Sequence, residues 1–335
     1  MQRGFILNTP PTLRKTALIT GASAGIGRDY ARYLAAEGYD LILTARRKAR
    51  LDEVARELSG AFGTQVTVLT ADLTDPAAPT KLAADIRKKK LQVDYLVNNA
   101  GYQVPGFFDR VRWDVQRDMM QIMMTAVAEL CHIFGPEMAA RGFGRIVNIS
   151  SVAAFVPGQA GGALYPSVKA FVLRLSQSLA TEYQSAGVHV VAVCPGFTWS
   201  EFHDVAGNRA QMNKLPGFMW LDGPKVVSDA HSAVEAGRGP VIVNGWIYKV
   251  LTTLLQTIPD NWVGRLAARG TRNNALRPED ARDAPVSPAR KSAPKKPAKK
   301  SSGKASGKSS GKSSGTAKTP ARKTAKRTDK QADNG

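Results

Sequence analysis

Residues 16–38 read TALITGASAGIGRDYARYLAAEG, which is a short β-branched and aliphatic run, a glycine turn and a helical run. Gly21, Gly25 and Gly27 give the turn a G-x-x-x-G-x-G spacing, and glycine lets a backbone approach a ligand closely. Such a turn points the free N–H groups and the positive end of the helix dipole at an anion. The stretch therefore predicts a buried strand, a pyrophosphate-binding turn and an amphipathic helix.

Further strand candidates follow this unit and alternate with helical stretches. With the first, they are Thr16–Thr20, Leu41–Ala45, Val66–Thr70, Tyr95–Asn98, Arg145–Ile149, Val188–Val193 and Val241–Val243. This alternation predicts an α/β fold, a doubly wound, Rossmann-like parallel sheet of about seven strands with helices on both faces. Ligands of such sheets bind at the carboxyl ends of the strands, where Gly21, Ser151 and Pro195 fall.

The end of the second strand indicates which dinucleotide would bind. Folds that bind NAD usually place a carboxylate there, on the ribose 2′-hydroxyl. This chain has Ala45, Arg46 and Arg47 instead, and a guanidinium suits a 2′-phosphate. We therefore expect NADP(H) in preference to NAD(H), with Arg46 as the first candidate and Arg47 as the second. The alternative, in which the arginines are only solvated at the start of the next helix, stays open, above all for Arg47.

Tyr165 and Lys169 lie four residues apart in ALYPSVKAFVL, and Tyr165 comes fourteen residues after Ser151, which closes RIVNISS. If the stretch is helical, both side chains share one face, and the ammonium should lower the phenol pKa from its usual ~10. A hydroxyl at the end of the preceding strand could hold a substrate carbonyl against that phenol. An isolated pair with this spacing would indicate only a packed surface, but its order after the glycine turn and Asn-Asn-Ala-Gly predicts a proton-transfer site.

Four motifs in fixed order, TGASAGIG, NNAG, ISS and YPSVK, resemble the short-chain dehydrogenase/reductase family. The resemblance covers approximately residues 15–243, and the flanking text looks most like the bacterial branch of ketone and 3-oxoacyl reductases. It implies an oxidoreductase that moves a hydride between NADP(H) and a ketone or secondary alcohol, lipid-like or 3-oxoacyl. It also implies a homo-oligomer.

The resemblance assigns roles to individual residues. Ser151 would polarise the substrate carbonyl, Tyr165 would be the general acid or base, and Lys169 would bind the nicotinamide ribose and lower the pKa of Tyr165. The remaining cofactor-binding residues that it implies are Gly21, Ser23, Gly25, Ile26 and Gly27 at the pyrophosphate, Arg46 at the 2′-phosphate, Asp72 and Leu73 at the adenine, Asn99, Ala100 and Gly101 beneath the adenosine ribose, and Pro195, Gly196 and Thr198 at the nicotinamide amide.

The chain departs from the family pattern at two places. Met123 stands where the family has a catalytic asparagine, and a thioether neither donates nor accepts strongly. Gly161-Gly162 adds one residue between Ser151 and Tyr165. Both departures support an alternative hypothesis, a dinucleotide-binding protein with little turnover that is tethered to nucleic acid by a basic tail.

Composition divides the chain into an N-terminal extension, residues 1–14, a dinucleotide-binding domain, residues 15–283, and a tail, residues 284–335. Within the domain we expect a substrate lid around residues 201–225. The aromatic residues of this region and its flanks favour a lipid-like or bulky ketone. Cys131 and Cys194 lie in apolar runs, which favours reduced core thiols. The four histidines have no ligand spacing, so we expect no metal.

The tail holds 15 basic and 2 acidic residues, hence +13 of the chain's formal net charge of +20. Its SSGK and ASGK units bury no core, so we expect disorder. Such a tail binds polyanions, either nucleic acid or an anionic membrane surface; an inert, solubilising extension is the open alternative.

Neither a signal-peptide pattern nor a run of 18 apolar residues occurs in the sequence. We therefore expect a cytoplasmic protein, with association with the nucleoid or a membrane surface as an open alternative. Residues 246–258 (WIYKVLTTLLQTI) favour a core or pocket helix over an interfacial or dimer-forming one.

Overall fold

The computed structural model describes residues 14–156, 162–199 and 216–257. Its centre is a seven-stranded parallel sheet with strand order β3-β2-β1-β4-β5-β6-β7. The strands are β1 (Thr16–Thr20), β2 (Asp40–Thr44), β3 (Val66–Val68), β4 (Tyr95–Asn98), β5 (Gly144–Ile149), β6 (Val188–Cys194) and β7 (Val241–Val243). The predicted doubly wound parallel sheet is confirmed, and every predicted strand is present.

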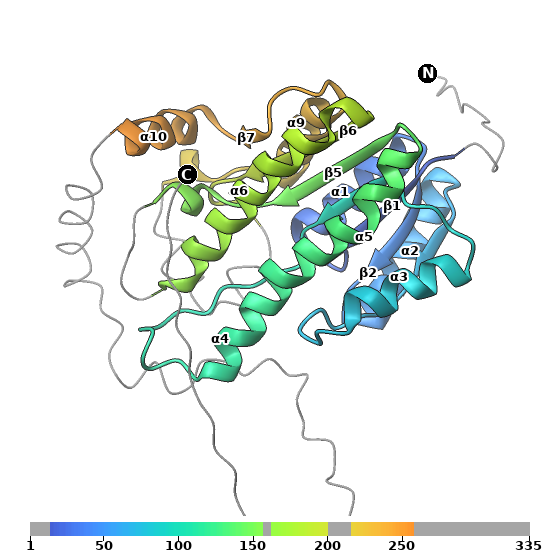
Figure 1. Ribbon diagram of the computed structural model, residues 1–335, viewed down its shortest axis with the longest axis horizontal. Coiled ribbons are helices and arrows are strands. Elements are labelled where there is room, and N and C mark those ends of the chain that lie inside the picture. The colour runs from blue at the N-terminus through green and yellow to red at the C-terminus, as the bar shows by residue number, and fades with distance from the viewer. Residues whose placement is uncertain (1–13, 157–161, 200–215, 258–335) are drawn as a thin grey trace, which may run out of the picture. The chain divides into compact units, whose positions relative to one another are not determined.

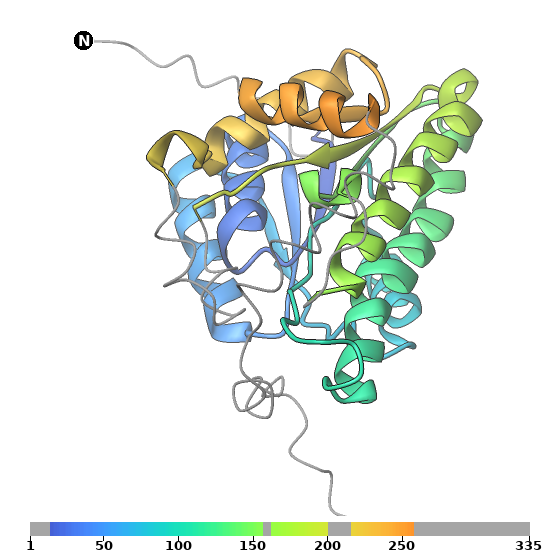
Figure 2. The same cartoon turned by 90° about the vertical axis from the view of Figure 1, so that its left-hand side faces the viewer.

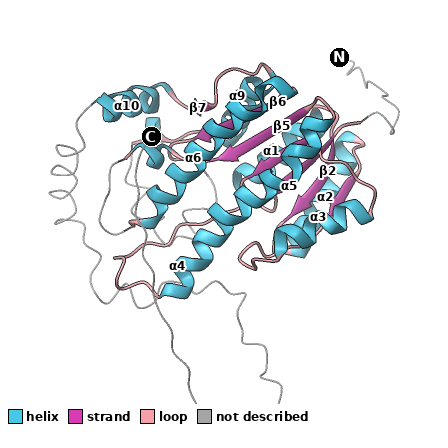
Figure 3. Cartoon of the chain, in the orientation of Figure 1, coloured by secondary structure: helices cyan, strands magenta, loops and turns pink. Residues whose placement is uncertain are grey.

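Helices cover both faces of this sheet (Figures 1 and 3). The α-helices are α1 (Gly25–Ala36), α2 (Lys48–Phe62), α3 (Ala78–Lys88), α4 (Trp113–Met120), α5 (Ala126–Ala140), α6 (Leu164–Tyr183), α9 (Gly223–Glu235) and α10 (Trp246–Thr257). A π-helical turn, η2 (Gln121–Thr125), joins α4 to α5, and short 3-10 turns are η3 (Val152–Phe155), η4 (Gln184–Ala186) and η5 (Gly217–Met219).

Alternation along the strands divides the apolar core into two layers. In β1, Ala17 and Ile19 face α1, α2 and α9, whereas Leu18 faces α3, α5 and α6. Successive side chains of a strand point to opposite faces, so a strand buried on both sides must be apolar throughout. All five residues of β1 are buried. Figure 2 shows the two layers, with blue α1 and α2 on one side of the sheet and green α5 and α6 on the other.

Several predictions of the sequence fall outside the described residues: the N-terminal extension, most of the lid, the boundary at residue 283 and the basic tail. Cys131 and Cys194 are buried and unpaired. Across the described ranges, no helix has the length and apolar character needed to cross a bilayer. The sequence predicts a core or pocket helix for residues 246–258. Only one side of α10 is in fact buried, through Tyr248 and Thr252.

Candidate active site

The glycine turn lies between β1 and α1, at the carboxyl end of the sheet. Gly21 has φ +67°, and a Cβ there would lie 2.7 Å from Asn99 Nδ2. A Cβ on Gly27 would overlap the carbonyl oxygen of Gly21 and lie 2.5 Å from the same amide nitrogen. Both positions therefore require glycine, Gly21 also because of its backbone conformation.

Asn99 and Thr20 hold this turn in place. Asn99 Nδ2 donates to the carbonyl oxygens of Thr20, at 2.9 Å, and of Gly21, at 3.3 Å. The Thr20 hydroxyl accepts from the backbone N–H groups of Asn99, at 2.9 Å, and Ala100, at 3.0 Å, and donates to Val97 O. These bonds join the ends of β1 and β4. Thr20 was missed by the sequence analysis, because it reads as an ordinary strand residue.

The N-terminus of α1 is open to an anion. Ala24 occupies the N-cap position without a side-chain hydrogen bond, and the first turn carries no acidic residue. The helix thus keeps its first N–H groups and its positive dipole end for a ligand. With no room for a Cβ at Gly21 or Gly27, the turn fits the pyrophosphate of a dinucleotide. Of the other predicted residues here, Gly25 begins α1 and Ile26 packs against the core.

Arg46 and Arg47 are exposed and follow β2 after one intervening residue, Ala45, where the sequence predicts contact with a 2′-phosphate. Arg47 is the N-cap residue of α2, and its guanidinium donates to Ser23 Oγ at 3.2 Å, so it contacts the glycine turn. Arg46 acts electrostatically on the Tyr102 phenol together with Asp118 and Asp72. Burial raises the pKa of that phenol to about 12, the two carboxylates add to the rise, and Arg46 opposes it.

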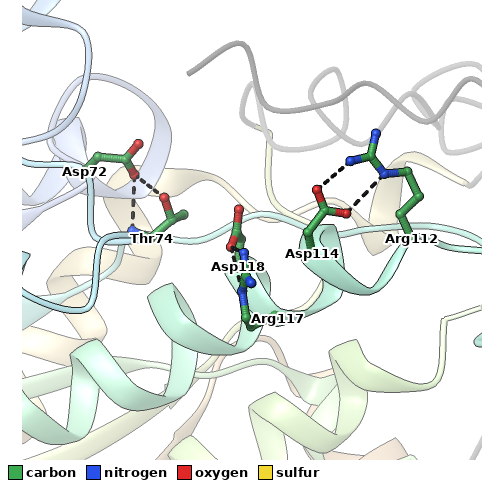
Figure 4. A network of polar contacts seen from close by, with 6 residues as sticks. All are labelled: Asp72, Thr74, Arg112, Asp114, Arg117 and Asp118. Carbon is green, nitrogen blue, oxygen red and sulfur yellow. Dashed lines mark hydrogen bonds and ion pairs between the residues drawn. The ribbon is translucent and has the colours of Figure 1, made fainter. Parts of the chain in front are cut away.

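Asp72 follows β3 and turns back onto its own loop. Its Oδ1 accepts from the Thr74 N–H at 3.1 Å and from the Thr74 hydroxyl at 2.8 Å (Figure 4). Leu73 is buried in the apolar cluster that contains Met123. The same view shows the Arg117–Asp118 ion pair of α4, at 3.0 Å. The two bonds with Thr74 fix the orientation of the Asp72 carboxylate, and its contact with the adenine side of the cofactor stays a prediction.

The structure brings Ser151, Tyr165 and Lys169 together at the end of β5. Ser151 is the N-cap of η3, and Tyr165 and Lys169 lie in the first turns of α6. Lys169 is buried, its Nζ donates to Ile149 O at 2.8 Å, and it lies 5.7 Å from the centre of the Tyr165 ring. The Ser150 hydroxyl donates to Lys169 O at 2.7 Å, which fastens α6 to β5.

The electrostatics of this trio differ from the expectation. Burial raises the pKa of Tyr165 to about 12, and a side-chain hydrogen bond with Ser151 opposes the rise. Burial also lowers the pKa of Lys169 to about 8, with Cys194 opposing. The net pKa of Tyr165 thus lies above its usual value instead of below it, because the loss of water around the phenol outweighs the hydrogen bond with Ser151. That Lys169 stabilises the phenolate stays a prediction.

The segment after β6 lies beside the same site. Ser150 N–H donates to Val193 O at 2.7 Å, and Val152 N–H donates to Pro195 O at 3.1 Å. These two bonds clamp the ends of β5 and β6 together, so Pro195 lies next to Ser151 in space.

Tyr248 of α10 supports this segment from outside. A Cβ on Gly196 would overlap the Tyr248 ring, and the Tyr248 hydroxyl accepts from Phe197 N–H at 3.2 Å and donates to Met219 O at 2.6 Å. Thr198 donates to Gly196 O at 3.1 Å. Sequence reasoning missed Tyr248, which comes some fifty residues later in the chain.

A buried polar chain couples the sheet to α6. Asn98 Nδ2 donates to Asn148 Oδ1 at 2.8 Å, and Asn148 Nδ2 donates to Ser176 Oγ at 2.9 Å. A buried amide that is hydrogen-bonded fixes its neighbours, because breaking the bond would leave an unsatisfied polar group. This chain therefore sets the position of α6, and with it Tyr165 and Lys169, relative to β4 and β5.

Met123 lies in the π-helical turn η2 and is only 1% exposed. Its side chain packs on Gly101, where a Cβ would lie 3.0 Å from Met123 Cγ and 3.1 Å from its sulfur. Tyr165 packs against the same apolar cluster. The position where an asparagine was expected is thus filled by a thioether.

A small pocket opens beside the start of α6. Its walls come from the β4–α4 connection, α4 and the residues before α6. Its larger lining residues are Val104, Phe108, Val111, Gln116, Met119 and Leu164. Most of these side chains are apolar, and the Gln116 amide is used by hydrogen bonds to Phe108 O and Val111 O.

Similarity to known proteins agrees with this geometry. The family model for short chain dehydrogenases matches residues 15–210. Oxidoreductase UcpA of Escherichia coli (strain K12) is 38% identical over 183 residues, which are 55% of this chain and 69% of that protein. The very-long-chain 3-oxoacyl-CoA reductase of Homo sapiens is 30% identical over 258 residues, 76% of this chain and 78% of that one.

A solved structure of a short-chain dehydrogenase from Sphingobium yanoikuyae in complex with NADPH superposes with a TM-score of 0.64 at 33% identity, over 78% of this chain and 96% of that chain. The chain thus combines the glycine turn and the seven-stranded parallel sheet with a sequence match to the family model over residues 15–210. The chain belongs to the short-chain dehydrogenase/reductase family and is an NAD(P)-dependent oxidoreductase.

Proposed function

We propose that the protein reduces a bulky, lipid-like ketone, such as a 3-oxoacyl thioester, to the secondary alcohol with NADPH, or catalyses the reverse reaction. The observation that carries the proposal is the trio at the end of β5. The Tyr165 phenol is hydrogen-bonded to Ser151, and Lys169, anchored to Ile149 O at 2.8 Å, lies one helical turn further along the same face.

Each residue of the trio has a task that suits its protonation state. The bound nicotinamide would supply the hydride. Ser151 would donate a hydrogen bond to the substrate carbonyl, and Tyr165, neutral because its pKa is about 12, would donate the proton. Lys169 keeps most of its positive charge at neutral pH, since its pKa is about 8. A buried cation close to the tyrosine stabilises the phenolate that forms as the proton leaves.

NADPH is favoured by the charges after β2. Arg46 and Arg47 are exposed there, and Arg47 contacts the glycine turn through Ser23. A guanidinium at this place attracts a phosphate and gives no acceptor to a free 2′-hydroxyl. Asp72, the nearby carboxylate of the β3 loop, is held by Thr74.

The substrate class follows from the apolar surroundings of Tyr165. Tyr165 packs against an apolar cluster that includes Met119, Ile122 and Met123. Two tryptophans at the base of the lid region, Trp199 and Trp220, stack with ring centres 4.0 Å apart. Apolar walls favour an alkyl or acyl group next to the ketone. A relative that is 30% identical over 258 residues is named as a 3-oxoacyl-CoA reductase, which agrees with this class.

A second candidate function is dinucleotide binding with little turnover, in a protein tethered to nucleic acid by its basic tail. Met123 favours it, because the buried thioether beside Gly101 cannot relay a proton. The tail's +13 charge provides the tether.

The experiment mixes purified protein with NADPH and a panel of ketones that includes 3-oxoacyl thioesters, and follows the loss of NADPH absorbance. Reduction should occur and should be abolished in Tyr165→Phe. Tyr33→Phe, which removes the same atom from α1 on the other face of the sheet, should keep the wild-type rate. If wild type and Tyr165→Phe are equally inactive while both bind NADPH, the reductase proposal is wrong and the low-turnover alternative gains support.

A further inference from the structure

The outer side of α10 carries a row of exposed apolar side chains. Trp246, Val250 and Leu254 follow one another at four-residue steps and are 74%, 61% and 53% exposed. Leu251, at 41% exposed, widens the row. Residues at this spacing lie on one face of a helix. Four neighbouring exposed apolar side chains indicate an interaction surface, for a protein or a membrane.

The inner side of α10 fixes which way this row faces. Tyr248 and Thr252 are its buried residues, and the Tyr248 hydroxyl bonds to Met219 O at 2.6 Å and to Phe197 N–H at 3.2 Å. The helix is thus attached through one face, and the apolar row points away from the body. Figure 2 looks onto α10, in orange, at the outer side of the helices and sheet. Phe218, next to Met219, is 70% exposed beside this attachment.

The charge of the chain narrows the choice of partner. α10 contains no acidic residue, and its one charged residue, Lys249, is exposed beside the apolar row. Residues 284–335, which follow, contribute +13. Two copies of a chain with a formal net charge of +20 repel each other, whereas an anionic surface attracts the chain. Nucleic acid would neutralise the positive charge of the tail, but it would leave the apolar side chains of α10 exposed to water.

We propose that α10 and the basic tail together seat the protein on the surface of an anionic lipid bilayer. The apolar row would enter the boundary between headgroups and acyl chains, with the amphipathic Trp246 ring at the headgroup level. The tail would be held by the negative surface potential, which attracts each Lys or Arg within a Debye length. Either signal alone gives weak, reversible binding, and the two together give stable attachment.

The test uses the full-length chain with sedimented vesicles, one set of phosphatidylcholine only and one set containing phosphatidylglycerol. Binding should be strong to the second set, weak to the first, and reduced by salt. Val250→Glu with Leu254→Glu should weaken binding to anionic vesicles by about tenfold or more, because two apolar side chains no longer leave water and two negative charges are added.

The matched control is Thr253→Glu with Gln256→Glu, which adds the same charge to exposed polar positions of the same helix. It should bind several-fold more tightly than the apolar-row variant. All four positions are exposed, so both variants should melt like the wild type, which circular dichroism checks.

Three results would overturn the proposal. Equal weakening by the two double variants would mean that charge alone drives binding. Equal binding to both vesicle sets would exclude the anionic surface. A change of mass in light scattering on Val250→Glu with Leu254→Glu, with vesicle binding unchanged, would identify a second copy of the chain as the partner. NADPH binding by each variant reports separately on the active site.

Discussion

Gly27→Ala adds one methyl group at the most confined point of the glycine turn. The new Cβ would overlap Gly21 O and lie 2.5 Å from Asn99 Nδ2 and 2.9 Å from the Gly21 carbonyl carbon. Contacts between unbonded carbon atoms are normally about 3.5–4.0 Å. Asn99 cannot swing away without losing its bonds to Thr20 O and Gly21 O, at 2.9 and 3.3 Å. The turn must therefore move away from α1.

Overpacking of this kind typically lowers the free energy of unfolding by roughly 1–3 kcal/mol. Loss of one of the two Asn99 bonds would account for about 1 kcal/mol of it. The displaced turn should also hold a pyrophosphate less well, so we expect the NADPH dissociation constant to rise by roughly tenfold or more. The melting temperature should fall by several degrees, at roughly 2–4 °C for each kcal/mol in a domain of similar size.

Gly60→Ala is the matched control. Gly60 lies near the end of α2, is exposed, has an ordinary negative φ, and has nothing within 4 Å of its would-be Cβ. Alanine should therefore stabilise the helix by up to about 0.5–1 kcal/mol and leave the cofactor alone. Urea unfolding and NADPH fluorescence titration measure both effects. A Gly27→Ala protein that binds NADPH and unfolds like the wild type would refute the steric reasoning.

Three further outcomes are expected. Arg46→Asp should shift the ratio of kcat/KM values from NADPH towards NADH by roughly tenfold or more, as a lost charge-assisted contact implies; an unchanged ratio would remove Arg46 from the phosphate site. Because burial lowers the pKa of Lys169 to about 8, kcat/KM for reduction should fall as the pH rises through about 8, and a flat profile from neutral to strongly alkaline pH would contradict its role. Burial also lowers the pKa of His231, which stacks on Tyr95 at 5.9 Å. The unfolded chain then binds the proton more readily, so His231 supports stability above its ordinary pKa of 6.5 and costs stability as the pH falls below that value. Urea titrations at about pH 7.5 and about pH 5.5 should show a smaller difference for His231→Phe than for wild type.

The strands could be predicted from the sequence because each is a compact run of mainly β-branched or aliphatic residues, and the five inner strands are almost fully buried. The largest differences between the predicted and the observed elements lie at their ends. The run Val66–Thr70 forms a strand only as far as Val68, since the chain then turns towards Asp72. The helix after the glycine turn begins at Gly25, three residues before the expected helical run.

The supporting contacts of the site could not be predicted, because their partners are far apart in the sequence. Asn98 and Asn148 are separated by fifty residues, and Thr20 and Asn99 by 79. A pattern within one stretch carries no information about such pairs. The π-helical turn around Met123 likewise leaves no signal in QIMMT, which reads as continuous helix.

The net pKa of Tyr165 could not be predicted for the same reason. Helical spacing correctly gave a shared face for Tyr165 and Lys169, but it could not show how completely water leaves them. In the folded chain burial drives both groups towards their neutral forms, the phenol to a pKa of about 12 and the ammonium to about 8. At neutral pH the pair is therefore a protonated phenol beside a largely charged amine. In the proposed reaction that state would give a proton to a developing alkoxide, and the charge on Lys169 would then stabilise the phenolate that remains. Oxidation of an alcohol would need the phenolate at the outset, against this burial.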